Sequence, residues 1–297
     1  QAGSAAELPH LLAEAFRLAV SGRPGPVLLD IPMDLQRADI TAPLPARIVP
    51  DGGPAVQPAA VSALLHDLSR AARPLILVGD GDAFCAGLDF ATVMKTPQKL
   101  AIGLIPRPWR GTNTFQEACW VWRRLPVPVI AAVHGHCLGG GLQLALAADF
   151  RITTPDAQWS VLEGKWGLIP DMTGVQSLSE LVGIETAKRL TMTAEFVTGA
   201  QAHELGLVGA VAANPEQAAI ELAHALTKRS PDALAGAKRL FNRTWSKGPA
   251  HTFWWELVEQ LQLLGRANNT AAQKAAFAKT EPIYRELRAV IDKLDQR

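Results

Sequence analysis

Two glycine-bearing segments constrain this chain most, because each follows a short apolar run and leaves main-chain N–H groups that no side chain covers. They are residues 84–89, FCAGLD, and residues 134–141, HGHCLGGG. The runs before them, residues 74–78 and 128–133, are predicted to be buried strands that end in turns. Two such amides from separate loops can converge on one oxygen and stabilise its negative charge by roughly 3 kcal/mol per donor. The alternative is that these glycines only shape turns.

Two acids, Glu163 and Asp171, lie in the apolar segment 159–171. A continuous helix would separate them by roughly 12 Å, but the glycines and the proline between them favour a loop that folds back. If Glu163 packs against Trp159 and Trp166, burial raises its pKa toward the range in which a carboxyl group exchanges protons. A nearby Asp171 would titrate together with it. The alternatives are an exposed loop acid for Glu163 and a turn or helix-capping residue for Asp171.

On these motifs, residues 79–297 resemble the crotonase family of enoyl-CoA hydratases and isomerases. The resemblance implies an α/β fold, the crotonase-like spiral of ββα repeats. It places two oxyanion-hole amides at Leu88 and Gly140, and it makes Glu163 the acid that exchanges a proton beside a thioester. Asp171 matches a second acid of the dienoyl-CoA isomerase branch. The implied substrate contacts are Ala86, Gly87, Asp89, Gly139, Trp166, Phe277 and Lys279. The last two would touch the coenzyme A moiety, and a solvated lysine is the alternative at position 279.

One residue departs from the hydratases, which carry a second catalytic glutamate where this chain has Gln143. In hydration that carboxylate activates water, whereas a neutral amide can hold water but cannot accept its proton. Isomerisation only removes a proton at one carbon and returns it at another, so Glu163 with Asp171, or Glu163 alone, would suffice. We therefore expect an enoyl-CoA isomerase, of the Δ3-Δ2 or dienoyl type, in which Gln143 orients substrate or water. A hydratase is the alternative.

Residues 1–80 have a different resemblance. The segments 14–34 and 60–80 are similar to thiamine-diphosphate enzymes of the acetolactate synthase type. The chain is therefore interpreted as a fusion joined near residues 78–81. Thiamine diphosphate is not expected to bind, because the activating glutamate and the metal-site asparagine of that family have no counterparts at the required places. A hypothesis of another class follows from the fusion, namely a catalytically silent product that at most binds acyl-CoA.

The predicted organisation has three parts. Residues 1–58 are the thiamine-enzyme-like fragment and a Pro/Gly-rich linker, residues 59–195 are the crotonase core, and residues 196–297 are a C-terminal helical region. In the core, residues 59–79 supply a borrowed helix and strand, after a borrowed strand at residues 27–31. These pieces are expected to complete the sheet, or else to dock poorly and leave the domain partly folded.

Two further segments carry predictions. Residues 95–114 show no periodicity and are expected to form a loop, which the resemblance implies walls the acyl pocket. Within the C-terminal region an apolar stripe recurs at helical spacing, and it consists of Trp254, Leu257, Val258, Leu261 and Leu264. Such a stripe is usually core, but the resemblance implies that these helices pack against neighbouring subunits in a homotrimer or hexamer.

Composition bears on other classes of function. The formal net charge is +1 without a long run of Lys or Arg, which argues against a nucleic-acid surface. No long apolar span and no secretion signal are recognised, so a cytoplasmic protein that does not span a membrane is expected. The cysteines lack metal-ligand spacing, and His134 and His136 have no third ligand nearby, so no metal site is expected. The implied reaction needs no cofactor other than the coenzyme A of its acyl-CoA substrate.

Overall fold

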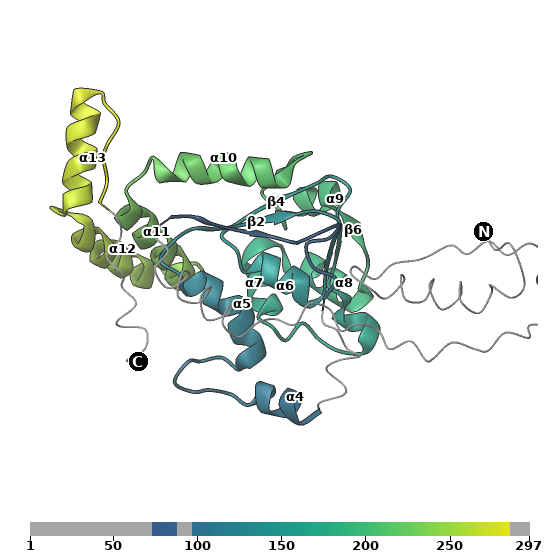
Figure 1. Ribbon diagram of the computed structural model, residues 1–297. Helices are drawn as coiled ribbons and strands as arrows, with labels where there is room; N and C mark the ends of the chain where they lie inside the picture. The colour runs from purple at the N-terminus through teal and green to yellow at the C-terminus, as the bar shows by residue number, and fades with distance from the viewer. Residues whose placement is uncertain (1–72, 88–96, 286–297) are drawn as a thin grey trace, which may run out of the picture. The chain divides into compact units, whose positions relative to one another are not determined.

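The computed structural model describes residues 73–87 and 97–285, and the fold is given for these residues (Figure 1). The strand and helix expected at residues 27–31 and 59–71 lie outside the described residues, as does the linker that follows residue 40. The proposed division into three domains therefore stays a prediction.

Within residues 73–87 and 97–285, seven short strands form two sheets. In the first sheet the order is β1-β2-β4-β7 and every neighbouring pair is parallel. The second sheet has the order β3-β5-β6, with β3 parallel and β6 antiparallel to β5. The strands are β1 (Leu75–Val78), β2 (Val129–Val133), β3 (His136–Leu138), β4 (Phe150–Thr153), β5 (Gln158–Ser160), β6 (Val197–Thr198) and β7 (Ala210–Val211). The two strands predicted from the apolar runs are present as β1 and β2. Only β2 is buried as expected, whereas β1 is half-buried and its Val78 is 48% exposed.

Helices follow the strands and fill the C-terminal region. They are α4 (Pro97–Leu104), α5 (Thr114–Arg124), α6 (Gly140–Leu146), the 3₁₀ helix η3 (Leu162–Trp166), α7 (Gly174–Leu181), α8 (Ile184–Thr193), α9 (Gly199–Glu204), α10 (Pro215–Thr227), α11 (Pro231–Thr244), α12 (Pro249–Leu263) and α13 (Ala267–Ala278). Local sequence explains several starts. Asn113 and Gln116 form a capping box at α5, while Asn214 and Ser230 cap α10 and α11 just before a proline.

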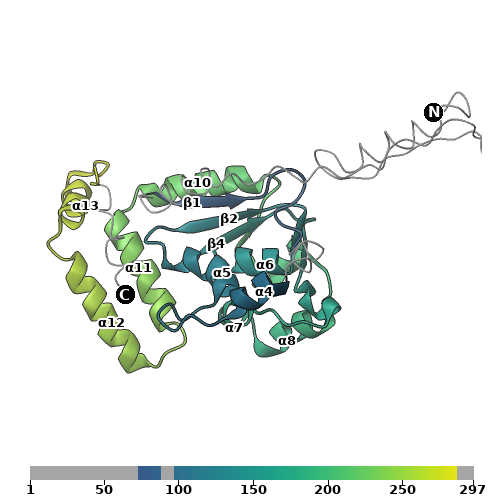
Figure 2. The ribbon, with the colours of Figure 1, turned by 60° about the horizontal axis from the view of Figure 1, so that its bottom comes forward.

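Strand β2 is the centre of the core because both of its faces are covered. Its five residues are fully buried, and they alternate between two hydrophobic clusters. Val129, Ala131 and Val133 pack in the cluster that includes residues of α6, α7 and α8, whereas Ile130 and Ala132 pack against α10. Figures 1 and 2 accordingly show α10 on one face of the first sheet and α5, α6 and α7 on the other. A continuous apolar run is what a parallel strand covered on both faces requires.

Two local expectations were wrong, and the core alternative for the apolar stripe is excluded. Residues 97–104 form helix α4 rather than loop, and β3 interrupts the second glycine segment, which was expected to be only a turn. The apolar stripe is not core within this chain, since Trp254, Leu257, Leu261 and Leu264 are 51–61% exposed on or next to α12. Among the helices that the structure describes, none is long and apolar enough to cross a membrane.

Candidate active site

A small cavity of about 140 Å³ gathers most of the residues that the sequence pattern singled out. It lies where the segment after β1, the junction of β3 with α6, the helix η3 and the turn before α7 meet. Its lining consists of Ala86, Gly87, Gly139, Gly140, Leu162, Glu163, Trp166, Leu168, Asp171 and Met172. The two glycine segments and the acid-bearing segment therefore converge, although each lies far from the others in sequence.

The glycines at the start of α6 let the backbone come close to this cavity. Gly139 has φ 52°, and a Cβ there would lie 3.4 Å from Oε1 of Glu163. Gly140 is the first residue of α6, where N–H groups have no partner within the helix. A Cβ on Gly140 would lie 3.2 Å from the Met172 sulfur. The chain thus presents main-chain atoms, and not side chains, on this wall.

Glu163 is held in η3 with its carboxyl group almost out of contact with solvent. The residue is 9% exposed, so the alternative of an exposed loop acid is wrong. Its Oε1 accepts a 2.6 Å hydrogen bond from Nε2 of Gln143, whereas Oε2 is buried with no hydrogen-bond partner in the part of the chain that the structure describes. Burial raises the pKa of Glu163, the charge of Asp171 adds to this, and hydrogen bonds from its own backbone and from Gln143 partly oppose it. A carboxyl group in this state is suited to exchange protons.

Asp171 lines the same cavity but is exposed. It lies in a turn, and it does not cap α7, because the residue at the N-cap is Thr173. The capping alternative is therefore wrong, while the turn alternative describes its backbone. Although eight residues separate the two acids along the sequence, both line this cavity, because η3 is followed by Gly167 with φ 70° and the chain folds back.

Gln143 is fully buried and is not among the lining residues of the cavity. Its amide nitrogen donates to Glu163, and its oxygen accepts hydrogen bonds from the main-chain N–H groups of Met172 at 2.8 Å and Gly174 at 2.9 Å. The sequence pattern gave no indication of these contacts with the turn before α7.

Several predicted residues are not brought to this cavity. Phe277 is 90% exposed on α13, and Lys279 follows that helix, and neither lines the cavity. Leu88 and Asp89 lie outside the described residues, so the second predicted amide donor stays a prediction. Conversely, Leu168 and Met172 line the cavity without having been singled out. Their only signal is an apolar side chain beside Asp171.

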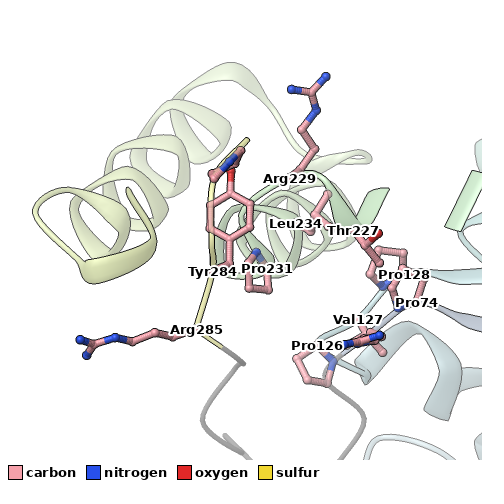
Figure 3. A pocket seen from close by; sticks show the side chains of 12 residues that line it. Pro74, Pro126, Val127, Pro128, Thr227, Arg229, Pro231, Leu234, Tyr284 and Arg285 are labelled. Carbon is pink, nitrogen blue, oxygen red and sulfur yellow. The ribbon is translucent and has the colours of Figure 1, made fainter. Parts of the chain in front are cut away.

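A larger cavity of about 320 Å³ lies elsewhere, near the prolines before β1 and β2 (Figure 3). Pro126, Pro128 and Tyr284 line it, together with three arginines. The guanidinium groups of Arg229 and Arg285 extend in different directions in Figure 3 rather than converging. No Asp, Glu, His or Cys belongs to its described lining. The described lining of this cavity therefore offers no carboxylate, imidazole or thiol for acid–base chemistry.

The two buried thiols, Cys119 and Cys137, offer no alternative nucleophile. Burial raises the pKa of Cys119 to about 12 and that of Cys137 well above its ordinary value, so neither is a thiolate near neutral pH. The Nε2 atom of His134 lies 2.9 Å from the carbonyl oxygen of Gly81.

Comparisons with known proteins identify chains that are similar to this one. Residues 61–281 match the family description "Enoyl-CoA hydratase/isomerase". The mitochondrial enoyl-CoA hydratase domain-containing protein 2 of Bos taurus is 39% identical over 176 residues, covering 57% of this chain and 57% of that protein. The peroxisomal Delta(3,5)-Delta(2,4)-dienoyl-CoA isomerase of Arabidopsis thaliana is 30% identical over 195 residues, covering 63% of this chain and 69% of that protein. The chain thus spans less than two thirds of the bovine protein's length.

Solved structures show the same fold. An enoyl-CoA hydratase from a Polaromonas species superposes with a TM-score of 0.68 at 29% identity, covering 76% of this chain and 88% of that one. The predicted α/β crotonase-like fold is confirmed. The family match begins at residue 61, within the segment 59–79 that was interpreted as borrowed, and no match supports a fused thiamine-enzyme fragment.

Proposed function

This chain belongs to the enoyl-CoA hydratase/isomerase family, and from that premise we propose that it is an isomerase that moves a double bond along an acyl-CoA thioester. The observation that carries the proposal is the state of the carboxyl group of Glu163. It is buried beside a small cavity, its pKa is raised, and one oxygen has no partner among the described residues. Such a group can take a proton from carbon and return it without water taking part.

In the proposed reaction, Glu163 removes a proton from the carbon next to the thioester of a 3-enoyl substrate. The electron pair moves into the carbonyl, and the resulting dienolate oxygen accepts hydrogen bonds from the main-chain amides of Leu88 and Gly140. The proton returns at the far carbon of the former double bond, delivered by Glu163 or by Asp171. The product is a 2-enoyl thioester, and no atom is gained or lost.

The position of Gln143 favours isomerisation over hydration. Hydration needs a second base to activate water, and the amide of Gln143 is neutral, fully buried and engaged at both ends. The relative named as a dienoyl-CoA isomerase supports including the dienoyl type in the proposal. Hydratase activity remains the second candidate, because other relatives carry hydratase names.

The test compares three thioesters on one preparation, namely 3-enoyl, 3,5-dienoyl and 2-enoyl. We expect turnover of the first two and slow water addition to the third. Asp171→Asn separates the two isomerase types, since loss of dienoyl turnover alone assigns Asp171 to the second proton transfer. Fast water addition to the 2-enoyl thioester would overturn the isomerase assignment. Saturable binding of an acyl-CoA without turnover would instead favour the catalytically silent fusion product.

We also propose that no metal, redox cofactor or thiamine diphosphate takes part, because main-chain amides suffice to hold the enolate charge. Coenzyme A enters as part of the substrate, with Asp89, Phe277 and Lys279 as proposed contacts. A thermal-shift assay with thiamine diphosphate and magnesium tests the exclusion, and a raised Tm would contradict it.

Oligomerisation is part of the proposal. The exposed stripe on α12 supports burial against another copy of the chain, in a homotrimer or hexamer. Sedimentation analysis of the wild type and of Leu257→Lys tests this. We expect the charged side chain to shift the species toward monomer, and a wild type that sediments as a monomer would contradict the proposal.

A further inference from the structure

Gln143 lies between two parts of the site without lining the cavity. Its side chain projects from α6, and its two amide atoms face in different directions. Nε2 donates to Oε1 of Glu163 at 2.6 Å, while Oε1 of Gln143 accepts from the N–H groups of Met172 and Gly174. One residue thus contacts the helix η3 that carries one candidate acid and the turn that follows the other.

The hydrogen-bond partners of Gln143 determine which atom of its side-chain amide is the oxygen and which is the nitrogen. Two main-chain N–H groups can only be matched by an oxygen, so the nitrogen must face Glu163. Residue 174 must also be glycine for this approach, since a Cβ there would lie 2.6 Å from the oxygen of Gln143. Gln143 and Gly174 therefore depend on one another sterically.

The turn held by this oxygen is strained. Thr173, between the two donating residues, has φ 74°, a left-handed conformation that a β-branched residue rarely adopts. Strained backbone persists only where the surrounding contacts hold it in place. Two hydrogen bonds to one buried oxygen, on either side of Thr173, supply such contacts.

The nitrogen has a separate effect on Glu163. By engaging Oε1, it leaves Oε2 as the carboxyl oxygen without a partner among the described groups. A Cβ on Gly139 would lie 3.4 Å from Oε1 and 3.8 Å from Oε2, so the glycine also leaves room for the carboxyl group to lie in this orientation.

We propose that Gln143 is a positioning residue that does not touch substrate. Its nitrogen holds Glu163 so that Oε2 is the atom that exchanges the proton, and its oxygen holds the turn that presents Asp171. The chemical role of Oε2 rests on the proposed isomerase function, whereas the contacts of Gln143 do not. Gln143 thereby sets the relative placement of the two acids.

Gln143→Glu is the most specific test, because glutamate keeps the shape and an acceptor oxygen for Met172 and Gly174. Once ionised, however, it offers no donor to Glu163, and the two carboxyl groups then compete for one proton. In 13C NMR of protein labelled at glutamate carboxyls, the Glu163 resonance should titrate at higher pH than in wild type. Glu163→Gln assigns that resonance. The matched control is Gln217→Glu on α10, where an exposed Gln217 donates to Glu221 at 3.2 Å, and it should leave the Glu163 titration unchanged.

Turnover gives a second measurement. Losing a donor to the ionised carboxylate lowers the fraction of Glu163 that can accept a proton, so kcat/KM of Gln143→Glu should fall about tenfold at mildly acidic pH and recover as the pH rises. KM should change little, because Gln143 lies off the cavity. A gain of water addition in this variant would show that position 143 reaches the reacting carbon, and it would overturn the inference.

Gln143→Met removes donor and acceptor together. We expect Glu163 again to titrate at higher pH, and the amides of Met172 and Gly174 to exchange hydrogen about tenfold faster or more. If this variant does not fold, hydrogen exchange in the wild type still tests the inference. Met172 and Gly174 amides that are not protected from exchange in the wild type would overturn it. An unchanged Glu163 titration in the folded variants would do the same. A wild type that turns over no thioester would overturn the proposed function, and the titration and exchange would still report on Gln143.

Discussion

Two buried polar centres of this molecule, around Lys238 and around Glu163, are equally removed from solvent and differ in how their hydrogen bonds are completed. Each of these residues is 9% exposed. The ammonium of Lys238 on α11 donates to the carbonyl oxygens of Trp122 and Val127 at 2.7 and 2.9 Å, and it pairs with Asp149 at 2.7 Å. All three of its donors are thereby used.

Glu163 has no such completion, because only one carboxyl oxygen is engaged among the described groups. The difference teaches how to separate structural from chemical burial. A charge whose every donor or acceptor is matched stabilises the packing around it, as Lys238 joins α11 to α5 and to the segments that precede β2 and β4. A buried group with one free oxygen beside a cavity is unfavourable for stability, and it is expected to be retained for its reactivity.

The largest expected effect is on activity, at Glu163. Glu163→Gln keeps the shape but removes the base, so kcat/KM for isomerisation should fall about 10³-fold, while the midpoint of thermal unfolding stays the same or rises. Glu259→Gln is the matched control, because Glu259 is also buried, at 5% exposed, but is paired with Arg239. It should keep its turnover. An active Glu163→Gln enzyme would remove the distinction between the two centres.

The next effect is on stability, at Lys238. Lys238→Met leaves Asp149 and two carbonyl oxygens without their partner, which should cost about 3 kcal/mol of unfolding free energy in urea titrations. Turnover per folded molecule should not change, because Lys238 does not line the cavity. Lys274→Met, at an exposed position of α13, should cost little. Loss of turnover in a folded Lys238→Met protein would contradict the assignment of this centre to structure.

Much of the fold is visible in the sequence because its signals are local. Apolar runs that end in glycine mark β1 and β2, and Asn or Ser before proline marks the starts of α10 and α11. The apolar neighbours of Glu163 left its burial as one of two alternatives, and the structure decides between them. Helix α4 was missed because its eight residues are too few to show a period, and β3 because its three residues lie between glycines.

The contacts of Gln143 were missed for a different reason. They join residues 20 to 31 positions apart, and they depend on a left-handed Thr173, which no sequence pattern signals. The sequence does identify position 143 as unusual, but by resemblance alone it suggests contact with substrate or water. Only the three-dimensional arrangement shows that both ends of the amide are engaged.

A smaller effect is expected at Gly139, where backbone and carboxyl group meet. Gly139→Ala forces a Cβ onto a residue with φ 52° and ψ −119°, 3.4 Å from Glu163, and should cost about 2 kcal/mol of stability together with part of the turnover. Gly265→Ala is the matched control, since its φ is 74° and nothing lies within 4 Å. It should lose stability without losing turnover. Equal turnover in the two variants would show that the Gly139 wall does not position Glu163.

The smallest effect is the pH dependence of stability, and its sign separates Glu163 from an acid of the structural kind. Because burial raises the pKa of Glu163, the folded state loses stability as the pH rises from about 4 through that pKa. In urea titrations, the unfolding free energy of Glu163→Gln should therefore rise relative to that of wild type over this pH range, and the difference should then stay constant at higher pH. At Glu117, burial is outweighed by the hydrogen bond from Thr112 and by Arg124, and the pKa is lowered. Glu117→Gln should show the opposite trend. Its loss of unfolding free energy relative to wild type should be largest at neutral pH and should shrink as the pH falls. If the pH dependence of stability has the same sign in both variants, the carboxyl group of Glu163 has hydrogen-bond partners as complete as those of Glu117.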